Sequence, residues 1–535
     1  MAVKLKGLKA LMSILKTLKE RKVGQWSLAY AAGAWVAIQI VDVMGGRWGV
    51  SESLARSIDV TLIAGFFIVV TVAWYHGDRG HQKFVGTELL LITIFLVAGV
   101  VGVLTAIRTG DALPSGEQIA IKDQSPSRHT AEAPWIAVLP FRKNNDAEDL
   151  DSFAAGLTTR INYGLASFPH LLIVSQGAME KAAEQLTDPR EISAAVGARF
   201  LMEGNMRSVG KTLRLTVQLT DAADGKQVWS TQADYDLQEI ADLELQDAIA
   251  DRVIASVGDS SGVVTRALAS TIESKPPEST TAYEAVLQWT VNRQRGGPEE
   301  HLRSRTALER AIELEPNDSF AWACLAHVYV EEYMSNYNPL PHPLERGLAA
   351  ARRAVALDRT DSFAHYSLAM AHYFGKNLDA FRVAAERSIE LNPYDASVLA
   401  MLGTLISFSG DWGAGLEITK RARQINPDHP GYYKFSLFYD QYLKGNNAAA
   451  LDIALQINMP YYYSDPLVRV LAHVRNGNMD AANEAAKELT QLFPNFEADF
   501  GRLGLTNWFF AQPELVEKIA TDLSEVGLTS DWTIY

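Results

Sequence analysis

Cysteine is almost absent from this sequence, and so are the motifs that hold metals and nucleotides. Cys324 is the single cysteine, so no disulfide can form within the chain. The 11 histidines are scattered without H-E-x-x-H or Cys-His spacing, which gives a zinc site no support. No G-x-x-x-x-G-K-[ST] occurs, and no G-x-G-x-x-G opens a helix after a strand. The sequence therefore predicts no metal and no cofactor.

A complete set of catalytic residues is also lacking. Residues 258–262, GDSSG, match the G-x-S-x-G pattern, in which the serine sits on a sharp turn between a strand and a helix. Here the preceding DAIADRVIASV has helical spacing, and no histidine-bearing motif follows in the required order. The prediction is a hinge in a protein that is not an enzyme, and a hydrolase that uses Ser260 is kept as an alternative.

Net positive charge is confined to the N-terminal part. The net charge is −14, but residues 1–110 hold 12 basic and 6 acidic side chains, whereas the rest of the chain holds 37 and 57. The larger, acidic part repels phosphate backbones. Binding of nucleic acid is therefore not expected.

Three long apolar runs lie near the N-terminus, at residues 26–44, 57–75 and 89–107. Each approaches the ~20 residues that a helix needs to cross a bilayer. Residues 1–25 are rich in lysine with an apolar stripe of leucines, which favours a cytoplasmic amphipathic segment on anionic lipid. The pattern predicts three transmembrane helices within residues 26–108 of a bacterial inner-membrane protein, with most of the chain in the periplasm. If the first run does not span, the body would be cytoplasmic.

Residues 134–258 follow a polar linker at 109–133 and predict an α/β domain. PWIAVLPF at 134–141 and LLIVSQ at 171–176 are typical of strands. A helix is expected to begin at Asp188-Pro189, with the aspartate as its cap. KTLRLTVQLTD alternates apolar and polar residues, and Asp224-Gly225 marks a hairpin turn. The predicted order is β-α-β-α-β-β-β-α.

The runs AVLPF, FAAGLTTRINYGLA, LLIVS and EGNMRSVGKTLRLTVQLTDAADGKQVW together resemble the TolB amino-terminal-like domain. The resemblance covers residues 134 to about 258, and the preceding AYAAGAWVAIQIVDV resembles the first helix of multi-span members. It implies a chain in which tetratricopeptide repeats follow the domain, as in bacterial membrane-anchored proteins related to class III adenylate cyclases and acid-responsive transmembrane activators. Because few residues precede residue 26, neither a cyclase domain nor a winged-helix domain is expected.

Residues 280–535, after a linker at 259–279, repeat an element that usually ends in proline: ELEP, ALDR, ELNP, QINP, INMP and LFP. After an insert, SNYNPLPHP, the spacing settles at about 34 residues, the period of tetratricopeptide repeats. Leu402, Gly403, Gly410 and Asp411 fit the repeat consensus, in which small residues let two antiparallel helices approach. The prediction is an all-α solenoid of about six or seven helix pairs.

Such solenoids bind partners on a concave face that the first helix of each pair lines. Counting from the starts of successive repeats, the predicted partner-binding residues are His327, Tyr366, Met370, Tyr373, Phe374, Thr404, Phe408, Tyr433 and Leu437. This aromatic and apolar row suits a peptide or helix from another protein of the cell envelope. The alternative is that these residues pack between repeats.

Together the patterns predict an inner-membrane-anchored periplasmic scaffold or sensor that binds a protein partner through its repeats. The alternative is the sensory component of a cyclase or transcription pathway whose output domain belongs to a separate protein. Homo-oligomer formation is left open.

Overall fold

The computed structural model divides into two compact units, residues 1–123 and 124–535. In the second unit it describes residues 133–143, 149–237, 243–259, 262–270, 272, 275–460, 462–494, 496 and 512–529. In the first unit it describes six positions: Tyr30, Ala34, Thr61, Phe66, Val69 and Val72.

The predicted membrane segments fall on the first unit. Apart from those six positions, the runs at 26–44, 57–75 and 89–107 lie outside the described residues, as do the basic segment 1–25 and nearly all of the linker 109–133. Crossing a bilayer takes ~20 apolar residues in one helix. Within the part of the chain that is described, no helix combines that length with that hydropathy. This finding contradicts the predicted inner-membrane localisation with a periplasmic body.

A mixed α/β domain follows, as predicted. Its elements are β1 (Trp135–Val138), β2 (Arg142–Lys143), α5 (Asp149–Leu165), β3 (Leu172–Ile173), α6 (Gln176–Gln185), α7 (Pro189–Val196), β4 (Phe200–Val209), β5 (Thr212–Asp221), β6 (Lys226–Asp236) and α8 (Leu243–Gly258). The sheet order is β3-β1-β4-β5-β6, and β2 pairs with β4. Strand β1 is parallel to β3 and β4, whereas β4, β5 and β6 form an antiparallel meander.

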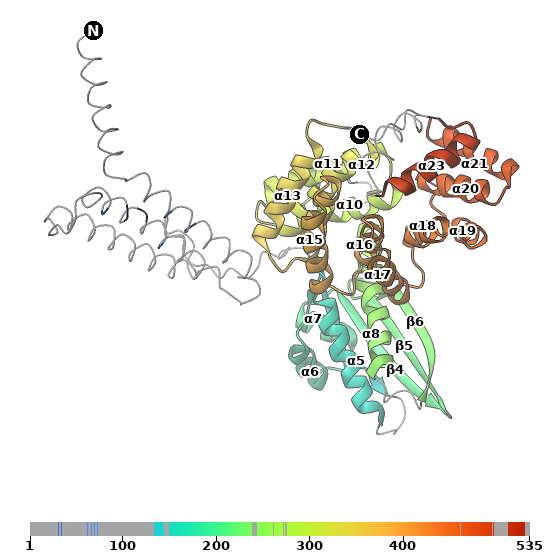
Figure 1. The fold of residues 1–535 in the computed structure, drawn as a ribbon. Coiled ribbons are helices and arrows are strands. Elements are labelled where there is room, and N and C mark those ends of the chain that lie inside the picture. Colours follow the sequence, from blue (N-terminus) through green and yellow to red (C-terminus); the bar gives the residue numbers. More distant parts are fainter. Residues whose placement is uncertain are drawn as a thin grey trace, which may run out of the picture. The chain divides into compact units, whose positions relative to one another are not determined.

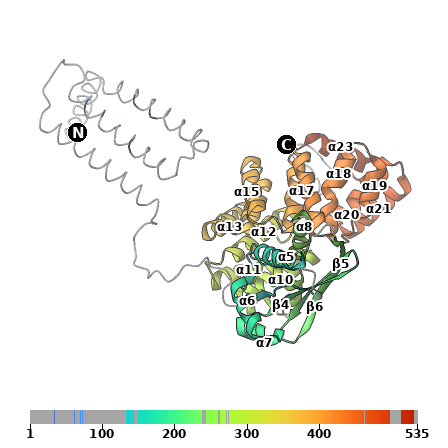
Figure 2. The same cartoon turned by 90° about the horizontal axis from the view of Figure 1, so that it is seen from below.

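Helices cover both faces of the sheet around β1 because alternate residues of a strand point to opposite sides. Ile136 and Val138 pack into the core that α5 and α8 share. Ala137 belongs to a second core, with Met179 from α6 and Ile192 from α7. In Figure 2, α5 and α8 lie on one side of the strands and α6 and α7 on the other.

Local sequence signals explain several elements of this domain. Asp188 accepts a hydrogen bond from the amide of Arg190 at 2.8 Å, and α7 begins at Pro189 as predicted. The predicted alternation along β5 is confirmed by the buried side chains of Leu213, Leu215, Val217 and Leu219. Gly225 turns the hairpin with a φ of 73°, which favours glycine. The strand predicted at 171–176 is shorter, since α6 begins at Gln176.

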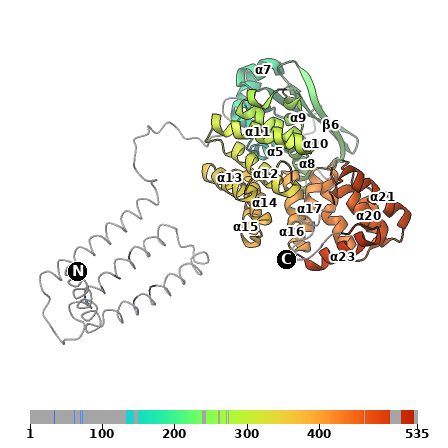
Figure 3. The same cartoon turned by 90° about the horizontal axis from the view of Figure 1, so that it is seen from above.

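The rest of the second unit is mostly helical. Its elements are α9 (Val263–Ala269), η2 (Pro277–Ser279), α10 (Ala282–Arg295), α11 (Pro298–Leu314), α12 (Ser319–Ser335), α13 (Pro343–Leu357), α14 (Ser362–Phe374), α15 (Leu378–Leu391), α16 (Ala396–Phe408), α17 (Trp412–Ile425), η3 (Gly431–Lys434), α18 (Phe435–Leu443), α19 (Asn447–Ala454), α20 (Ser464–Arg475), α21 (Met479–Leu492) and α23 (Pro513–Glu525). Helices that are neighbours in the sequence pack against each other in pairs, as Figures 1 and 3 show.

Two series of helix caps give this region its solenoid-like regularity. Asp361 and Asp395 cap α14 and α16, and stand 34 residues apart in the sequence. Asn377 and Asp411 cap α15 and α17 with the same separation. A side-chain oxygen at each cap accepts a backbone hydrogen bond that the first helical turn would otherwise lack. The predicted assignment to tetratricopeptide repeats stays a prediction.

The predicted linker 259–279 differs from the structure, because it contains α9, whose residue Val264 is buried.

Candidate partner-binding face and its buried polar groups

The nine residues predicted to bind a partner lie on α12, α14, α16, η3 and α18. Eight of them are buried: His327, Tyr366, Met370, Tyr373, Phe374, Thr404, Phe408 and Tyr433. Leu437 is half-buried. These residues therefore pack between the helices. The sequence pattern also fitted a groove, because helical spacing places core residues and groove residues on the same stripe. Contact of these residues with a partner stays a prediction.

His327 is a polar side chain enclosed by aromatic rings. It stacks on Tyr366 with ring centroids 5.6 Å apart and meets Trp289 edge-on at 5.7 Å. Its Nδ1 atom is buried, and among the described residues it has no hydrogen-bond partner. Burial, helped by the charge of Arg293, lowers the pKa of His327 to about 3. The imidazole is therefore neutral near pH 7.

Replacing His327 by phenylalanine should make the protein less sensitive to acid. A histidine whose pKa is lowered in the folded state takes up its proton mainly on unfolding. The contribution of His327 to the free energy of unfolding is therefore present above about pH 6.5 and is lost as the pH falls toward 3. We expect the stability difference between His327→Phe and the wild type to grow by about 1.4 kcal/mol between pH 7.5 and 5.5, measured by urea unfolding. The control is Tyr366→Phe, which alters the same aromatic cluster and should leave the pH dependence as it is. A difference that stays flat for His327→Phe would contradict a buried neutral histidine.

A charged group that sequence analysis did not single out lies beside His327. Arg293 lies in the last turn of α10, and its guanidinium lies 5.0 Å from the Trp289 ring centroid. Burial alone would lower its pKa, but the phenols of Tyr432 and Tyr366 and the nearby aspartates raise it. Glu331 stands one helical turn after His327 on α12, and burial raises its pKa to about 7 in spite of the Arg293 charge. We call Arg293, His327 and Glu331 the Arg293 cluster.

The Arg293 cluster offers a half-buried cation and a carboxyl group that can hold a proton near neutral pH. Such a pair suits a polar group on a partner segment, and charges in partly desolvated surroundings interact more strongly than at an open surface. No sequence motif marks this cluster, because its members come from helices more than 30 residues apart. Across the part of the chain that is described, no three His, Cys, Asp or Glu side chains gather as a metal site would require.

The GDSSG segment has a structural context unlike that of a serine nucleophile. Gly258 ends α8 and Gly262 caps α9, so the segment joins two helices and no strand leads into it. Ser260 lies outside the described residues. Asp259 is 2% exposed and accepts a hydrogen bond from the amide of Ser397 at 3.1 Å. The segment thus attaches the α/β domain to the first turn of α16.

A buried carboxylate makes a second attachment between the two regions. Asp251 on α8 is 4% exposed. It accepts hydrogen bonds from Arg160 of α5 at 3.1 Å and from Arg421 of α17 at 3.2 Å. A buried anion shared by two cations fixes their geometry, since losing either partner leaves a poorly compensated charge. The α/β domain and the helical region are therefore held together at α8 and α17.

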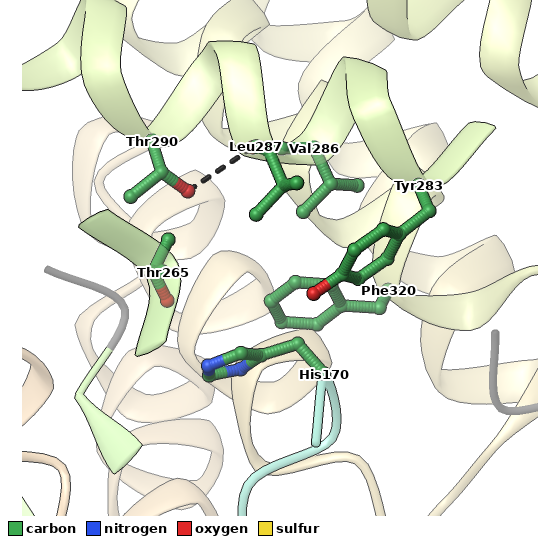
Figure 4. Close-up of a pocket in the computed structure, with 7 residues that line it drawn as sticks. All are labelled: His170, Thr265, Tyr283, Val286, Leu287, Thr290 and Phe320. Carbon is green, nitrogen blue, oxygen red and sulfur yellow. Dashed lines mark hydrogen bonds between the residues drawn. The ribbon is translucent and has the colours of Figure 1, made fainter. Parts of the chain in front are cut away.

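One small cavity lies where these regions meet (Figure 4). It is lined by His170, Thr265, Tyr283, Val286, Leu287, Thr290 and Phe320 and has a volume of about 10 Å³. His170 stacks on Phe320 at 5.4 Å, and the Thr290 hydroxyl donates to the carbonyl of Val286 at 3.0 Å. A space of this size holds about one water. This cavity is too small for a substrate.

Comparisons with known proteins match parts of the chain to a regulator domain and to a protein named as a cyclase. Residues 132–252 match the sequence model of the family described as the second domain of HilA/YgeH-like transcriptional regulators. A curated protein, putative adenylate cyclase 3 of Rhizobium meliloti (strain 1021), is 25% identical over 248 residues, 46% of this chain. The chain spans 41% of the length of that relative. The name of this relative agrees with the adenylate cyclases that the sequence resemblance included.

Two solved structures are distant neighbours of the chain. TolB from Acinetobacter baumannii shares 16% identity with a TM-score of 0.16, over 22% of this chain and 27% of that one. The LpoB C-terminal domain from Salmonella enterica shares 17% identity with a TM-score of 0.15, over 19% and 83%. Scores this low carry no argument about function.

Proposed function

We propose that this chain is a non-enzymatic part of a regulatory system, in which the helical region binds a protein partner and the α/β domain relays that event. The output, a nucleotide cyclase or a transcription regulator, belongs to a separate protein. This proposal joins the partner-binding hypothesis with the sensory alternative that the sequence analysis raised.

The attachment of the α/β domain to the helical region carries the proposal. The Asp251 carboxylate binds guanidinium groups from both regions, so a displacement of α17 pulls on α8. Coupling between two sites requires such a physical connection. The similarity of residues 132–252 to a regulator domain supports a regulatory setting for this coupling.

Site-specific photo-crosslinking in cells tests the proposal. A photoreactive phenylalanine analogue is placed at Leu437, the half-buried member of the predicted row, in the full chain. The matched control carries it at Val383, which is 69% exposed on α15. We expect one protein to be captured from position 437 and not from 383, and an excess of unlabelled chain should compete with capture.

The outcomes separate the two parts of the proposal. A captured protein with a cyclase or DNA-binding domain supports the regulatory setting. Capture of a protein without such a domain supports partner binding and contradicts the proposed output. Equal capture from both positions, or none from either, contradicts binding through this face.

A further inference from the structure

Strand β6 forms one edge of the sheet. It ends the strand order β3-β1-β4-β5-β6, and among the described residues no further strand pairs with its outer side. The opposite edge strand, β3, is two residues long, whereas β6 has eleven residues, Lys226–Asp236. In a strand that is paired on one side, every second residue points its backbone N–H and C=O groups away from the sheet. Strand β6 therefore offers a row of backbone hydrogen-bonding groups to a further strand.

A bulge confines regular pairing to the later part of this edge. Gln227 and Trp229 pair with consecutive residues of β5, so Val228 between them is an extra residue that forms a β-bulge. Bulges disturb pairing along an edge and are one way in which proteins protect it. From Trp229 to the end of β6 the register with β5 has no further shift. A second strand can therefore pair regularly with residues 229–236.

The side chains of this stretch are complementary to those of an identical strand. Trp229 and Tyr235 are half-buried and pack against the same core, and the exposed Gln232 lies midway between them. If two copies pair antiparallel about Gln232, each Trp229 lies opposite Tyr235 of the other copy, on the same face, which is a favourable cross-strand pair. The two Gln232 amides then meet at the two-fold axis, where each is both a donor and an acceptor for the other.

The charges along β6 also favour a second copy in the antiparallel direction. Lys226 lies at the beginning of the strand, Asp234 and Asp236 lie at its end, and the residues between Lys226 and Asp234 are uncharged. Antiparallel pairing places each basic beginning beside an acidic end, whereas parallel pairing would place like charges together. Asp234 also pairs with Arg214 of β5 at 2.7 Å, so its carboxylate is neutralised where Ser230 of the second copy would lie opposite it.

We infer that β6 is a homodimer interface, at which two copies of the chain join their sheets edge to edge as antiparallel strands centred on Gln232. Each copy contributes the same strand, as a two-fold interface requires. One pair of strands buries little surface compared with a stable dimer, so the association is weak and depends on concentration. This inference concerns the α/β domain and does not depend on the partner proposed for the helical region.

Opposite charges at the two-fold axis test the interface in the purified full chain. Sedimentation between ~1 and ~100 µM should show the wild type passing from monomer to dimer. We expect Gln232→Lys and Gln232→Glu, each alone, to raise the dimer dissociation constant about tenfold, because like charges then lie opposite one another. An equimolar mixture of the two variants should recover the wild-type dissociation constant or a lower one, because each mixed dimer places a lysine opposite a glutamate.

The matched controls are Gln185→Lys and Gln185→Glu, at an exposed position at the end of α6. They change the net charge of the chain by the same amounts, so the dissociation constant should stay at the wild-type value for each alone and for their mixture. A wild type that stays monomeric over this range, Gln232 variants that associate as the wild type does, or a mixture that does not recover association would overturn the interface. Because no other protein enters this experiment, its failure is distinct from a failure of the crosslinking test.

Discussion

Replacing Glu332 by alanine should lower the free energy of unfolding by about 3–5 kcal/mol, the usual cost of breaking a buried ion pair. Glu332 is 0% exposed on α12. Its carboxylate accepts hydrogen bonds from Arg305 at 2.9 Å and from the amide of Leu340 at 2.6 Å, and it pairs with Arg346. Removing it leaves the guanidinium groups without their shared anion. Urea unfolding followed by far-ultraviolet circular dichroism measures the loss.

The same carboxylate orders the insert between α12 and α13. Arg305 also donates to the carbonyl of Asn338 at 2.8 Å. Asn338 has a φ of 47°, and Asn336 and His342 also have positive φ values. Non-glycine residues adopt this conformation only when their surroundings hold them there. In Glu332→Ala we therefore expect protease cleavage of the insert to accelerate as stability falls.

The control is Glu345→Ala, in the helix that follows the insert. The Glu345 side chain is 72% exposed and lies 3.4 Å from His342, so this change should leave the stability close to that of the wild type. If Glu332→Ala lost as little as this control, the carboxylate would not organise the insert.

Local signals explain why much of this fold could be predicted. The cap at Asp188, the alternation along β5 and the hairpin at Asp224-Gly225 each depend on residues within a few positions of one another. The repeated caps of α14 to α17 are local in the same way. Such signals fix helices, strands and their order, which is why the α/β domain followed by a helical region was predictable.

The polar contacts between distant segments could not be predicted. Asp251 meets Arg421 across 170 residues, and Tyr462 meets Arg293 across 169. Neither pair has a spacing that recurs, so nothing in the sequence selects these partners. The predicted groove residues show a different difficulty. Their helical periodicity is real, but periodicity alone does not distinguish residues of the core from residues that bind a partner.

Replacing Gly415 should lower the free energy of unfolding far more than the surrounding sequence suggests. A Cβ atom there would lie 2.6 Å from the backbone nitrogen of Ser407 and even closer to the carbonyl oxygen of Gly403. The same holds for Gly403, where a Cβ atom would lie 2.7 Å from the Gly415 carbonyl oxygen. Helices α16 and α17 thus touch backbone to backbone. Because backbone cannot rotate away, Gly415→Ala should lower the free energy of unfolding by about 3 kcal/mol or more.

Gly413, two residues earlier in α17, is the matched control with the opposite sign. It is exposed, and a Cβ atom there would have its nearest neighbour 3.9 Å away. Alanine favours a helix over glycine by about 0.8–1.0 kcal/mol in a helix interior, so Gly413→Ala should stabilise by up to about that amount. Urea unfolding of both variants measures the pair. A loss of stability in both would indicate that α17 needs glycine for a reason other than contact with α16, whereas opposite signs isolate the packing of the two backbones.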